Sequence, residues 1–197
     1  VIMDIVYNHT YNKEMFQNIT GKYYTSTDLS GCGNSTDSKN DMVSRFIRDS
    51  LEYWLTEYNV DGFRFDLVGI FDIQDFKEWG EYLNNKYPER NLLMYGEPWN
   101  GYATDPSEGT RVRMGTIRQG VSGHVGVFNG KFRECVKGGS DNNDGGFMFN
   151  MTYRDLGVGV SNNVECVSAG VKGAIGDNTN MWTPLFAADP EQSINYL

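Results

Sequence analysis

Asp61-Gly62-Phe63-Arg64-Phe65-Asp66-Leu67 is the stretch that decides the fold. Successive side chains of a strand point to opposite faces, so we expect Phe63 and Phe65 on one face and Arg64 and Asp66 on the other. A guanidinium beside a carboxylate favours the charged form and lowers the pKa of the carboxylate. The stretch therefore predicts a strand that packs on one face and holds an ionised Asp66 on the other, although an ordinary structural ion pair would show the same pattern.

Two further apolar stretches flank this strand, which we expect at about 60–66. Residues 1–7 and 91–96 are almost continuously apolar, as parallel strands covered on both faces are. Between the three strands lie segments with the periodicity of helices. Strand, helix, strand, helix, strand is the order of a parallel α/β sheet.

The two helices are delimited by recognisable end signals. Apolar and aromatic residues at helical spacing predict a helix over 42–58, with Asp41 as its cap. A second helix is expected to begin after Asp72 and to end at Pro88. The intervening segment 8–40 is rich in Thr, Asn, Gly and Ser, and a loop of that length in a compact domain is usually functional or disordered.

Beyond Trp99 the pattern weakens. Residues 125–129 predict a short fourth strand and 131–137 a helix, whereas 138–180 indicate only a long loop with room for a helix. The chain opens on a complete strand pattern and closes, at 193–197, on what resembles an interrupted strand. We therefore expect residues 1–197 to be an internal fragment of one larger domain, which leaves the cellular location open.

Composition excludes several classes of protein. The net charge of −9 over 197 residues, with no basic stripe, argues against a nucleic-acid partner. No apolar run approaches the length that spans a membrane. Three cysteines, Cys32, Cys135 and Cys166, show neither a disulfide framework nor metal-ligand spacing. The 12 tyrosines and 4 tryptophans suit a protein that stacks on flat or sugar-like ligands as well as one with a large core.

Each of the three main strands is followed by polar residues at its carboxyl end, where parallel sheets assemble their chemistry. These residues are Asn8 and His9, Arg64 with Asp66, and Glu97 with Trp99. Glu97 has no cation beside it in sequence, which favours a raised pKa, whereas Arg64 should keep Asp66 ionised. Two carboxylates with opposite pKa tendencies are what acid-plus-nucleophile glycoside chemistry requires.

Three segments together resemble the first three signature regions of the α-amylase superfamily, glycoside hydrolase family 13: Asp4-Ile-Val-Tyr-Asn-His9, Asp61-Gly-Phe-Arg-Phe-Asp66 and Tyr95-Gly-Glu-Pro-Trp99. Within it the chain is most similar to the type I pullulanases, on Tyr-Gly-Glu-Pro-Trp, on Gly-Cys-Gly-Asn at 31–34 and on Gly-Val-Phe-Asn from 126. The resemblance implies a partial (β/α)8 TIM barrel, about strands 3 to 7 of a catalytic domain.

The same resemblance implies roles for particular residues. Asp66 corresponds to the nucleophile and Glu97 to the general acid/base. Arg64 would hold Asp66, and His9 would donate a hydrogen bond to the sugar at the cleavage point. The remaining expected cleft-lining residues are Asn8, Leu67 and Trp99. Asp4 is expected to be structural.

The implied activity is retaining hydrolysis of α-1,6 branch linkages in pullulan, starch or related α-glucans. An isoamylase, a glycogen-debranching enzyme or an α-1,4-amylase of the same superfamily is the alternative, and a non-catalytic carbohydrate-binding relative is a third reading that the two carboxylates oppose. The family's fourth signature, with a third carboxylate, should begin just past Tyr196, so we expect residues 1–197 alone to be inactive. No cofactor is required; a structural calcium ion is compatible with Asn8, but no loop has calcium-ligand spacing.

Overall fold

The computed structural model describes residues 1–101, 110–113, 116–117, 124–128, 130–137, 175–177 and 180–185. The chain divides into two compact units, Val1–Phe128 and Asn129–Leu197, which are described separately.

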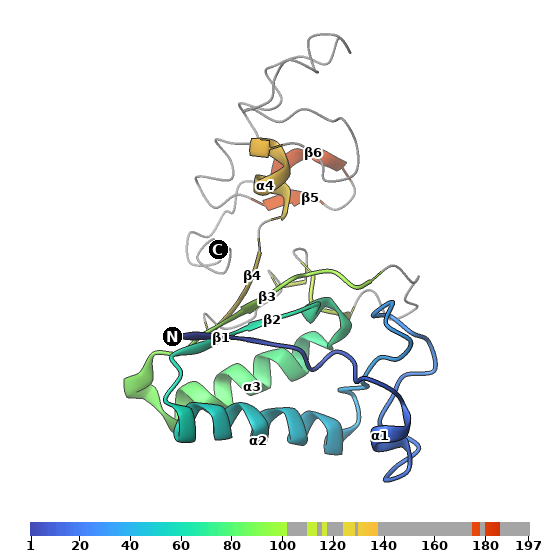
Figure 1. Ribbon diagram of the computed structural model, residues 1–197. Helices are drawn as coiled ribbons and strands as arrows, with labels where there is room; N and C mark the ends of the chain where they lie inside the picture. Colours follow the sequence, from blue (N-terminus) through green and yellow to red (C-terminus); the bar gives the residue numbers. More distant parts are fainter. Residues whose placement is uncertain are drawn as a thin grey trace. The chain divides into compact units, whose positions relative to one another are not determined.

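A four-stranded parallel sheet forms the centre of the first unit (Figure 1). Its strands lie in the order in which they follow one another along the chain: β1 (Ile2–Ile5), β2 (Gly62–Phe65), β3 (Leu93–Gly96) and β4 (Val125–Val127). The register places Asp4 beside Arg64 and Arg64 beside Tyr95. The predicted parallel α/β sheet is confirmed, and each strand is shorter than the sequence pattern indicated.

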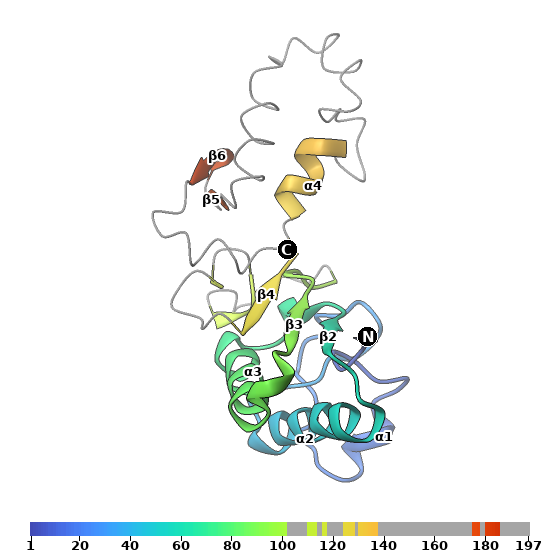
Figure 2. The ribbon, with the colours of Figure 1, turned by 90° about the vertical axis from the view of Figure 1, so that its left-hand side faces the viewer.

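Two helices, α2 (Asp41–Tyr58) and α3 (Ile73–Lys86), cover one face of this sheet (Figure 2). Phe65 of β2 lies against α3, with ring centroids 5.2 Å from Phe76 and 6.2 Å from Trp79. Four apolar side chains of α2 are buried with them: Val43, Ile47, Leu51 and Leu55. The two predicted amphipathic helices are therefore confirmed, although Phe46 and Tyr58, which share the apolar pattern of α2, are 45% and 59% exposed.

The ends of the helices confirm one predicted cap and correct the other. Asp72 precedes α3 and its Oδ1 accepts a hydrogen bond from the main-chain N–H of Gln74 at 3.0 Å. Asp41, in contrast, is already the first residue of α2, and the capping position belongs to Asn40. An acidic residue in the first turn still interacts favourably with the helix dipole, which explains why the sequence signal for a helix start was present.

The other face of the sheet differs from the prediction. Strands covered on both faces were expected, but Ile2 is 40% exposed and Leu93 is 42% exposed in the part of the chain that the structure describes. Ile2 and Leu93 are the register partners of Gly62 on either side, and alternation places them on the face that carries Arg64. That face holds the polar cluster described below.

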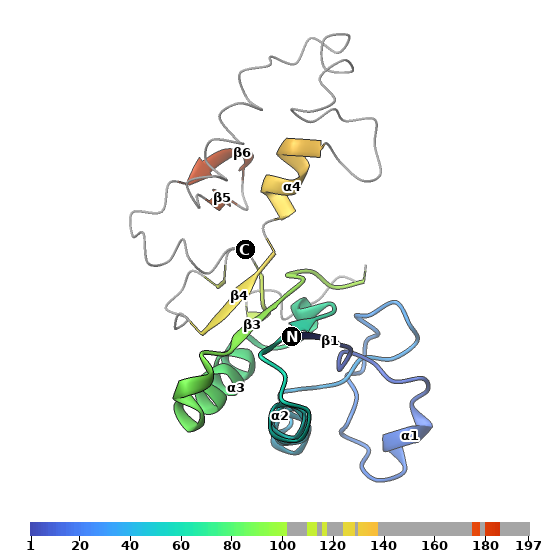
Figure 3. The same cartoon turned by 60° about the vertical axis from the view of Figure 1, so that its left-hand side comes forward.

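The long connection between β1 and α2 contains a short helix, α1 (Glu14–Gln17), and lies on the side of α2 away from α3 (Figure 3). Phe16 and Tyr23 stack in it at 4.3 Å. Two short 3-10 turns follow β2 and α3, namely η1 (Val68–Ile70) and η2 (Pro88–Arg90). The connection is thus an ordered loop.

The second unit contains α4 (Gly130–Lys137) and an antiparallel pair, β5 (Ile175–Asp177) with β6 (Asn180–Leu185). The predicted helix over 131–137 is confirmed, and β5 and β6 were not predicted. The expected strand at 193–197 lies outside the described residues, as does most of the loop over 138–180. Among the helices described, none is both long and apolar enough to cross a membrane.

Candidate active site

The carboxyl ends of β1, β2 and β3 bring the predicted site residues together. The ladder of main-chain hydrogen bonds continues one step past the strands: Asp66 N donates to Ile5 O at 3.0 Å, and Glu97 N donates to Phe65 O at 3.1 Å. Asp66 and Glu97 therefore follow neighbouring strands at the same level of the sheet. Because Arg64 and Asp66 are two residues apart, both point to the uncovered face, as the sequence predicted.

Arg64 lies at the centre of the cluster and contacts three carboxylates. Its Nη2 is 2.5 Å from Oε1 of Glu97, and its Nη1 is 2.9 Å from Oδ1 of Asp4 and 3.5 Å from Oδ1 of Asp66. Burial alone would lower the pKa of Arg64, but the hydrogen bond to Asp4 and the charges of Glu97, Asp4 and Asp66 raise it. The guanidinium is a permanent positive charge that holds both predicted catalytic carboxylates.

The contact with Glu97 corrects the sequence interpretation. We expected Glu97 to have no cation beside it, yet its closest charged neighbour is Arg64. The reason is the register: β3 pairs with β2 so that Tyr95 lies opposite Arg64, and Glu97, two residues further on, points to the same face. Its second carboxylate oxygen, Oε2, accepts a hydrogen bond from the main-chain N–H of Leu67 at 3.2 Å.

Asn8 is fully buried, and its side chain links Asp66 to His9. Its Nδ2 donates to the carboxylate Oδ2 of Asp66 at 2.9 Å and to the Asp66 carbonyl at 2.8 Å. These two acceptors fix the orientation of the amide, so its Oδ1 faces Nδ1 of His9 at 2.5 Å. Asn8 was expected to line the cleft; the structure instead places it behind Asp66, because it makes all of these bonds while shielded from solvent.

The bond to Asn8 also determines how His9 can interact with a ligand. An amide oxygen only accepts, so Nδ1 of His9 carries the proton in that contact. In a neutral ring Nε2 is then an acceptor. The sequence interpretation treated His9 as a donor, and in this geometry the neutral ring would accept a hydrogen bond from a sugar hydroxyl.

Leu67 and Gly96 show how the backbone is shaped around the carboxylates. Leu67 adopts the left-handed conformation, with φ 40° and ψ 48°, which costs free energy for a residue other than glycine. That conformation presents its N–H to Glu97. At Gly96 a Cβ atom would lie 2.6 Å from the carbonyl oxygen of Phe65, so only glycine allows the end of β3 to approach β2 this closely.

Trp99 is half-buried at the end of the segment that follows β3. Its main-chain N–H donates to the carbonyl of Glu97 at 2.8 Å, and its own carbonyl lies so close to Gly69 that a Cβ there would overlap it. The segment carrying Trp99 is therefore fixed against the turn that follows Asp66. All seven predicted site residues lie at or just beyond the carboxyl ends of β1, β2 and β3.

Two aromatic neighbours of Arg64 stand in the quoted motifs but were not predicted to be site residues. Its guanidinium lies 5.7 Å from the ring centroid of Phe128, and Phe128 meets Tyr95 edge-on at 5.3 Å. Both follow from alternation on β3 and β4, because Tyr95 and Phe128 share the face of Arg64. An aromatic ring beside a guanidinium adds a cation–π contact and restricts its motion.

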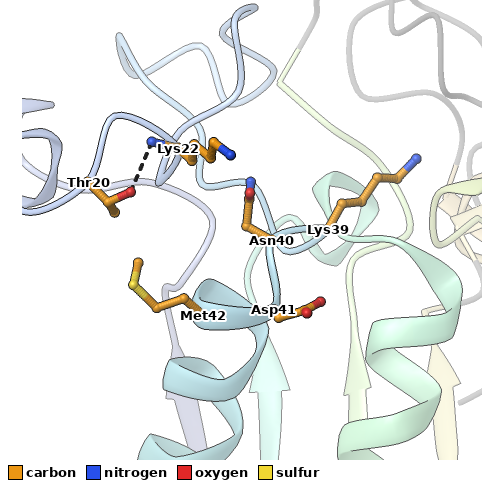
Figure 4. A pocket seen from close by; sticks show the side chains of 6 residues that line it. All are labelled: Thr20, Lys22, Lys39, Asn40, Asp41 and Met42. Atoms are coloured by element: carbon orange, nitrogen blue, oxygen red, sulfur yellow. Dashed lines mark hydrogen bonds between the residues drawn. The ribbon is translucent and has the colours of Figure 1, made fainter.

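A separate hollow of about 300 Å³ lies at the N-terminal end of α2 (Figure 4). Lys39 is in an ion pair with Asp72 at 3.4 Å, and Asp41 adds a carboxylate to the lining. The residues that line it are Thr20, Lys22, Lys39, Asn40, Asp41 and Met42. None of them is a predicted site residue, and we assign the hollow no role in the chemistry.

The geometry around Arg64 has a definite chemical capacity. Two carboxylates, Asp66 and Glu97, are held on one exposed side of a sheet end by a shared cation, a buried amide and a main-chain N–H. A pair of carboxyl groups facing one site can act as nucleophile and proton donor toward a glycosidic bond. Within the described residues no group of His, Cys, Asp and Glu side chains has an arrangement that could hold a metal ion.

Comparison with known proteins gives a consistent answer, although no family model matches. Pullulanase from Bacillus subtilis (strain 168) is 33% identical over an alignment of 208 residues, which covers 100% of this chain and 26% of the relative. Isoamylase 3 of rice (Oryza sativa subsp. japonica) is 40% identical over 86 residues, 36% of this chain and 11% of that protein.

Solved structures agree with the sequence relatives. Pullulanase from Anoxybacillus sp. LM18-11 in complex with maltotriose superposes with a TM-score of 0.72 at 32% identity, over 88% of this chain and 24% of that one. The chain thus spans about a quarter of the length of these pullulanases. Over that quarter, sequence and fold agree, and the chain belongs to the pullulanase family.

Proposed function

We propose that residues 1–197 form part of one catalytic (β/α)8 barrel, in which β1 to β4 are consecutive strands within the range of about strands 3 to 7. The exposed apolar side chains of Ile2 and Leu93 support this proposal. They lie on the face opposite the helices, which in a closed barrel is the packed interior. The outer helices of such a barrel correspond to α2 and α3.

The proposed reaction is retaining hydrolysis of an α-glycosidic bond. Asp66 attacks the anomeric carbon while Glu97 donates a proton to the leaving oxygen; water, deprotonated by Glu97, then releases the sugar from Asp66. The observation that carries this proposal is that both carboxylates, from adjacent parallel strands, contact the one guanidinium of Arg64. A protein that only binds carbohydrate has no use for this pair.

The surrounding residues have distinct roles in this proposal. Asn8 orients Asp66 through a charge-assisted hydrogen bond, and Arg64 together with the N–H of Leu67 orients Glu97. His9 accepts a hydroxyl of the sugar that is cleaved, and Trp99 forms the wall on the leaving-group side. Because Glu97 must carry a proton to act as the acid, we expect substrate binding to weaken its contact with Arg64.

The proposed substrates are α-1,6-linked branches of pullulan, starch and related α-glucans, as the names of the relatives suggest. An isoamylase-type debranching enzyme is the second candidate, favoured by the local similarity to rice isoamylase 3. The full-length chain should be assayed on pullulan, glycogen and amylose. Preference for pullulan supports the first candidate, preference for glycogen the second, and rapid cleavage of amylose alone would contradict both.

The roles of the two carboxylates can be tested in the same full-length chain. Glu97→Gln should slow cleavage of an aryl glycoside with a good leaving group far less than cleavage of pullulan, because a good leaving group needs little protonation. Equal losses on both substrates would contradict the role of Glu97 as the acid. No cofactor is part of this proposal, and residues 1–197 alone are expected to be inactive.

A further inference from the structure

The loop Asp28–Thr36, which no proposed catalytic role includes, is organised around one carboxylate. Oδ1 of Asp28 accepts from the N–H of Ser30 at 3.0 Å and from its hydroxyl at 2.8 Å, and Oδ2 accepts from the N–H of Gly33 at 2.7 Å. Burial alone would raise the pKa of Asp28, but the hydrogen bonds from Ser30, Gly33 and Ser35 lower it. The loop is therefore internally rigid and depends on an ionised Asp28.

One side of this loop is attached to the segment that follows β1. Oδ1 of Asn34 accepts from the main-chain N–H of Thr10 at 2.9 Å, and its Nδ2 donates to the Thr10 carbonyl at 2.7 Å. The N–H of Thr36 donates to the carbonyl of Asn8 at 3.0 Å. His9 lies between these two attachment points, so the loop fixes the backbone on both sides of it.

The other side of the loop is attached to the segment that follows β3. The N–H of Gly101 donates to the carbonyl of Leu29 at 2.7 Å. The two chains approach so closely that a Cβ atom on Gly101 would overlap the carbonyl of Ser30. Gly101 is two residues after Trp99, so the loop also limits the position of the Trp99 wall.

We propose that Asp28–Thr36 is a positioning brace that sets the separation between His9 and Trp99, and with it the affinity for an oligosaccharide that contacts both. This inference rests on the proposed function, which places a sugar between the two residues. His9 and Trp99 follow strands β1 and β3, which are not neighbours in the sheet, so the sheet itself does not join them directly. Displacements of about 1 Å in a positioning element can change rates or affinities as much as 100-fold.

Amide hydrogen exchange in the full-length chain tests the brace without any substrate. Asp28→Asn replaces an acceptor oxygen by an NH₂ group and loosens the loop. We expect exchange at the amides of both Thr10 and Gly101 to become at least about tenfold faster, since each is protected by a bond to the loop. Asp37→Asn is the matched control. The carboxylate of Asp37 accepts hydrogen bonds from Lys39 and Asn40 in the same connection, and it has no hydrogen bond to Thr10 or Gly101. Faster exchange confined to the loop's own amides would overturn the proposal.

A second pair of variants tests the consequence for binding. Gly101→Ala should push the brace away from the Trp99 segment, whereas Gly21→Ala adds a Cβ that meets no atom within 4 Å. We expect Gly101→Ala to raise KM for pullulan about tenfold, and to leave the pH profile and the cleavage of a short aryl glycoside nearly unchanged. Equal KM values in the two variants would contradict the brace.

The double variant Asp28→Asn/Gly101→Ala shows whether the two single variants raise KM for pullulan through the same loop, Asp28–Thr36. If both act through the brace, the rise in KM is smaller than the product of the single rises. Fully independent effects would contradict a common brace. If the full-length chain hydrolysed no α-glucan, the proposed function would fail, while the exchange comparison would still decide for or against the brace.

Discussion

The two faces of the four-stranded sheet are built for different purposes. The face under α2 and α3 is closed and apolar: Phe63, Phe65 and Met94 are fully buried there. The opposite face exposes Ile2 and Leu93 in the described part of the chain, and at its carboxyl end it carries the cluster around Arg64. Neighbouring residues of a single strand therefore contribute to the apolar core on one side and to the candidate catalytic cluster on the other.

This separation has a measurable consequence. A truncation on the helix-covered face removes apolar burial and leaves a cavity, which costs folding free energy. A change of charge or shape at the carboxyl end of the open face leaves that packing intact, so it should alter turnover far more than stability. Each prediction below applies to the full-length chain and tests one side of this division.

The largest effect is expected for Asp66→Asn. An amide is not a nucleophile toward the anomeric carbon, so no covalent intermediate can form and the rate should fall by at least about 10⁴-fold on every substrate. The melting temperature should change little, because the carboxylate is partly exposed. Turnover on pullulan and on an aryl glycoside, with a thermal melt, measures both. Asp49→Asn, an exposed position on α2, is the control; activity retained in Asp66→Asn would contradict its assignment.

On the helix-covered face, Phe76→Ala should destabilise the fold without a specific effect on chemistry. Phe76 is fully buried against Phe65, and such truncations cost about 3–5 kcal/mol. Denaturant unfolding gives the stability, and kcat measured well below the melting temperature should remain near that of the parent. Phe46→Ala on α2 should cost much less, because Phe46 is 45% exposed. A loss of kcat in fully folded Phe76→Ala would show that the two faces are coupled.

Arg64→Lys should reduce turnover by about 100-fold while changing the melting temperature little. Lysine keeps the charge but has no planar fork with which to contact Glu97, Asp66 and Asp4 at once. Steady-state kinetics and a melt distinguish the outcomes. Arg45→Lys, which alters an exposed ion pair on α2, is the matched control. A loss mainly of stability would mean that the Arg64 cluster is an ordinary structural ion pair.

Much of the sheet could be predicted because its signals are local. The alternation of Phe63, Arg64, Phe65 and Asp66 predicted two different faces, and the structure has them. Helical periodicity likewise predicted α2, whose aliphatic side chains Val43, Ile47, Leu51 and Leu55 are buried, whereas Phe46 and Tyr58 are exposed. The predicted ends of helices and strands were less accurate. Asn40 and Asp41 are adjacent and both residue types suit a helix start, so residue type alone did not distinguish them.

The contacts that cross between strands could not be predicted. Arg64 and Glu97 are far apart in sequence, and their contact depends on the register of β2 and β3, which no single segment encodes. Burial of Asn8 depends in the same way on the loop that returns through Thr36. The contacts of the brace could not be predicted either, because the bond between Gly101 and Leu29 joins two segments without any common motif. Local patterns therefore predicted which residues gather at the candidate site and not how they are held.

The helix-covered side also holds polar groups, among them a carboxyl group between α2 and α3. Oδ2 of Asp75 is a buried oxygen without a hydrogen-bond partner in the described structure, and its Oδ1 is 3.4 Å from the hydroxyl of Ser44. Burial raises the pKa of Asp75 to about 6, and the charges of Asp72 and Glu78 add to the rise, while the nearby hydroxyls of Ser38 and Ser44 lower it. Ionised Asp75 is thus disfavoured in the folded state.

The smallest expected effect is therefore a pH-dependent one. The pKa of Asp75 is higher in the folded protein than in the unfolded chain, so its contribution to stability is complete below about pH 4 and is lost as the pH rises through about 6. Asp75→Asn should match the parent at low pH and melt a few degrees higher at pH 8. Thermal melts from pH 4 to 8 measure the difference between variant and parent, which cancels other titrating groups. Asp41→Asn controls for the loss of an acidic residue from the first turn of a helix. A difference that does not change with pH would show that Asp75 ionises as readily in the folded protein as in the unfolded chain.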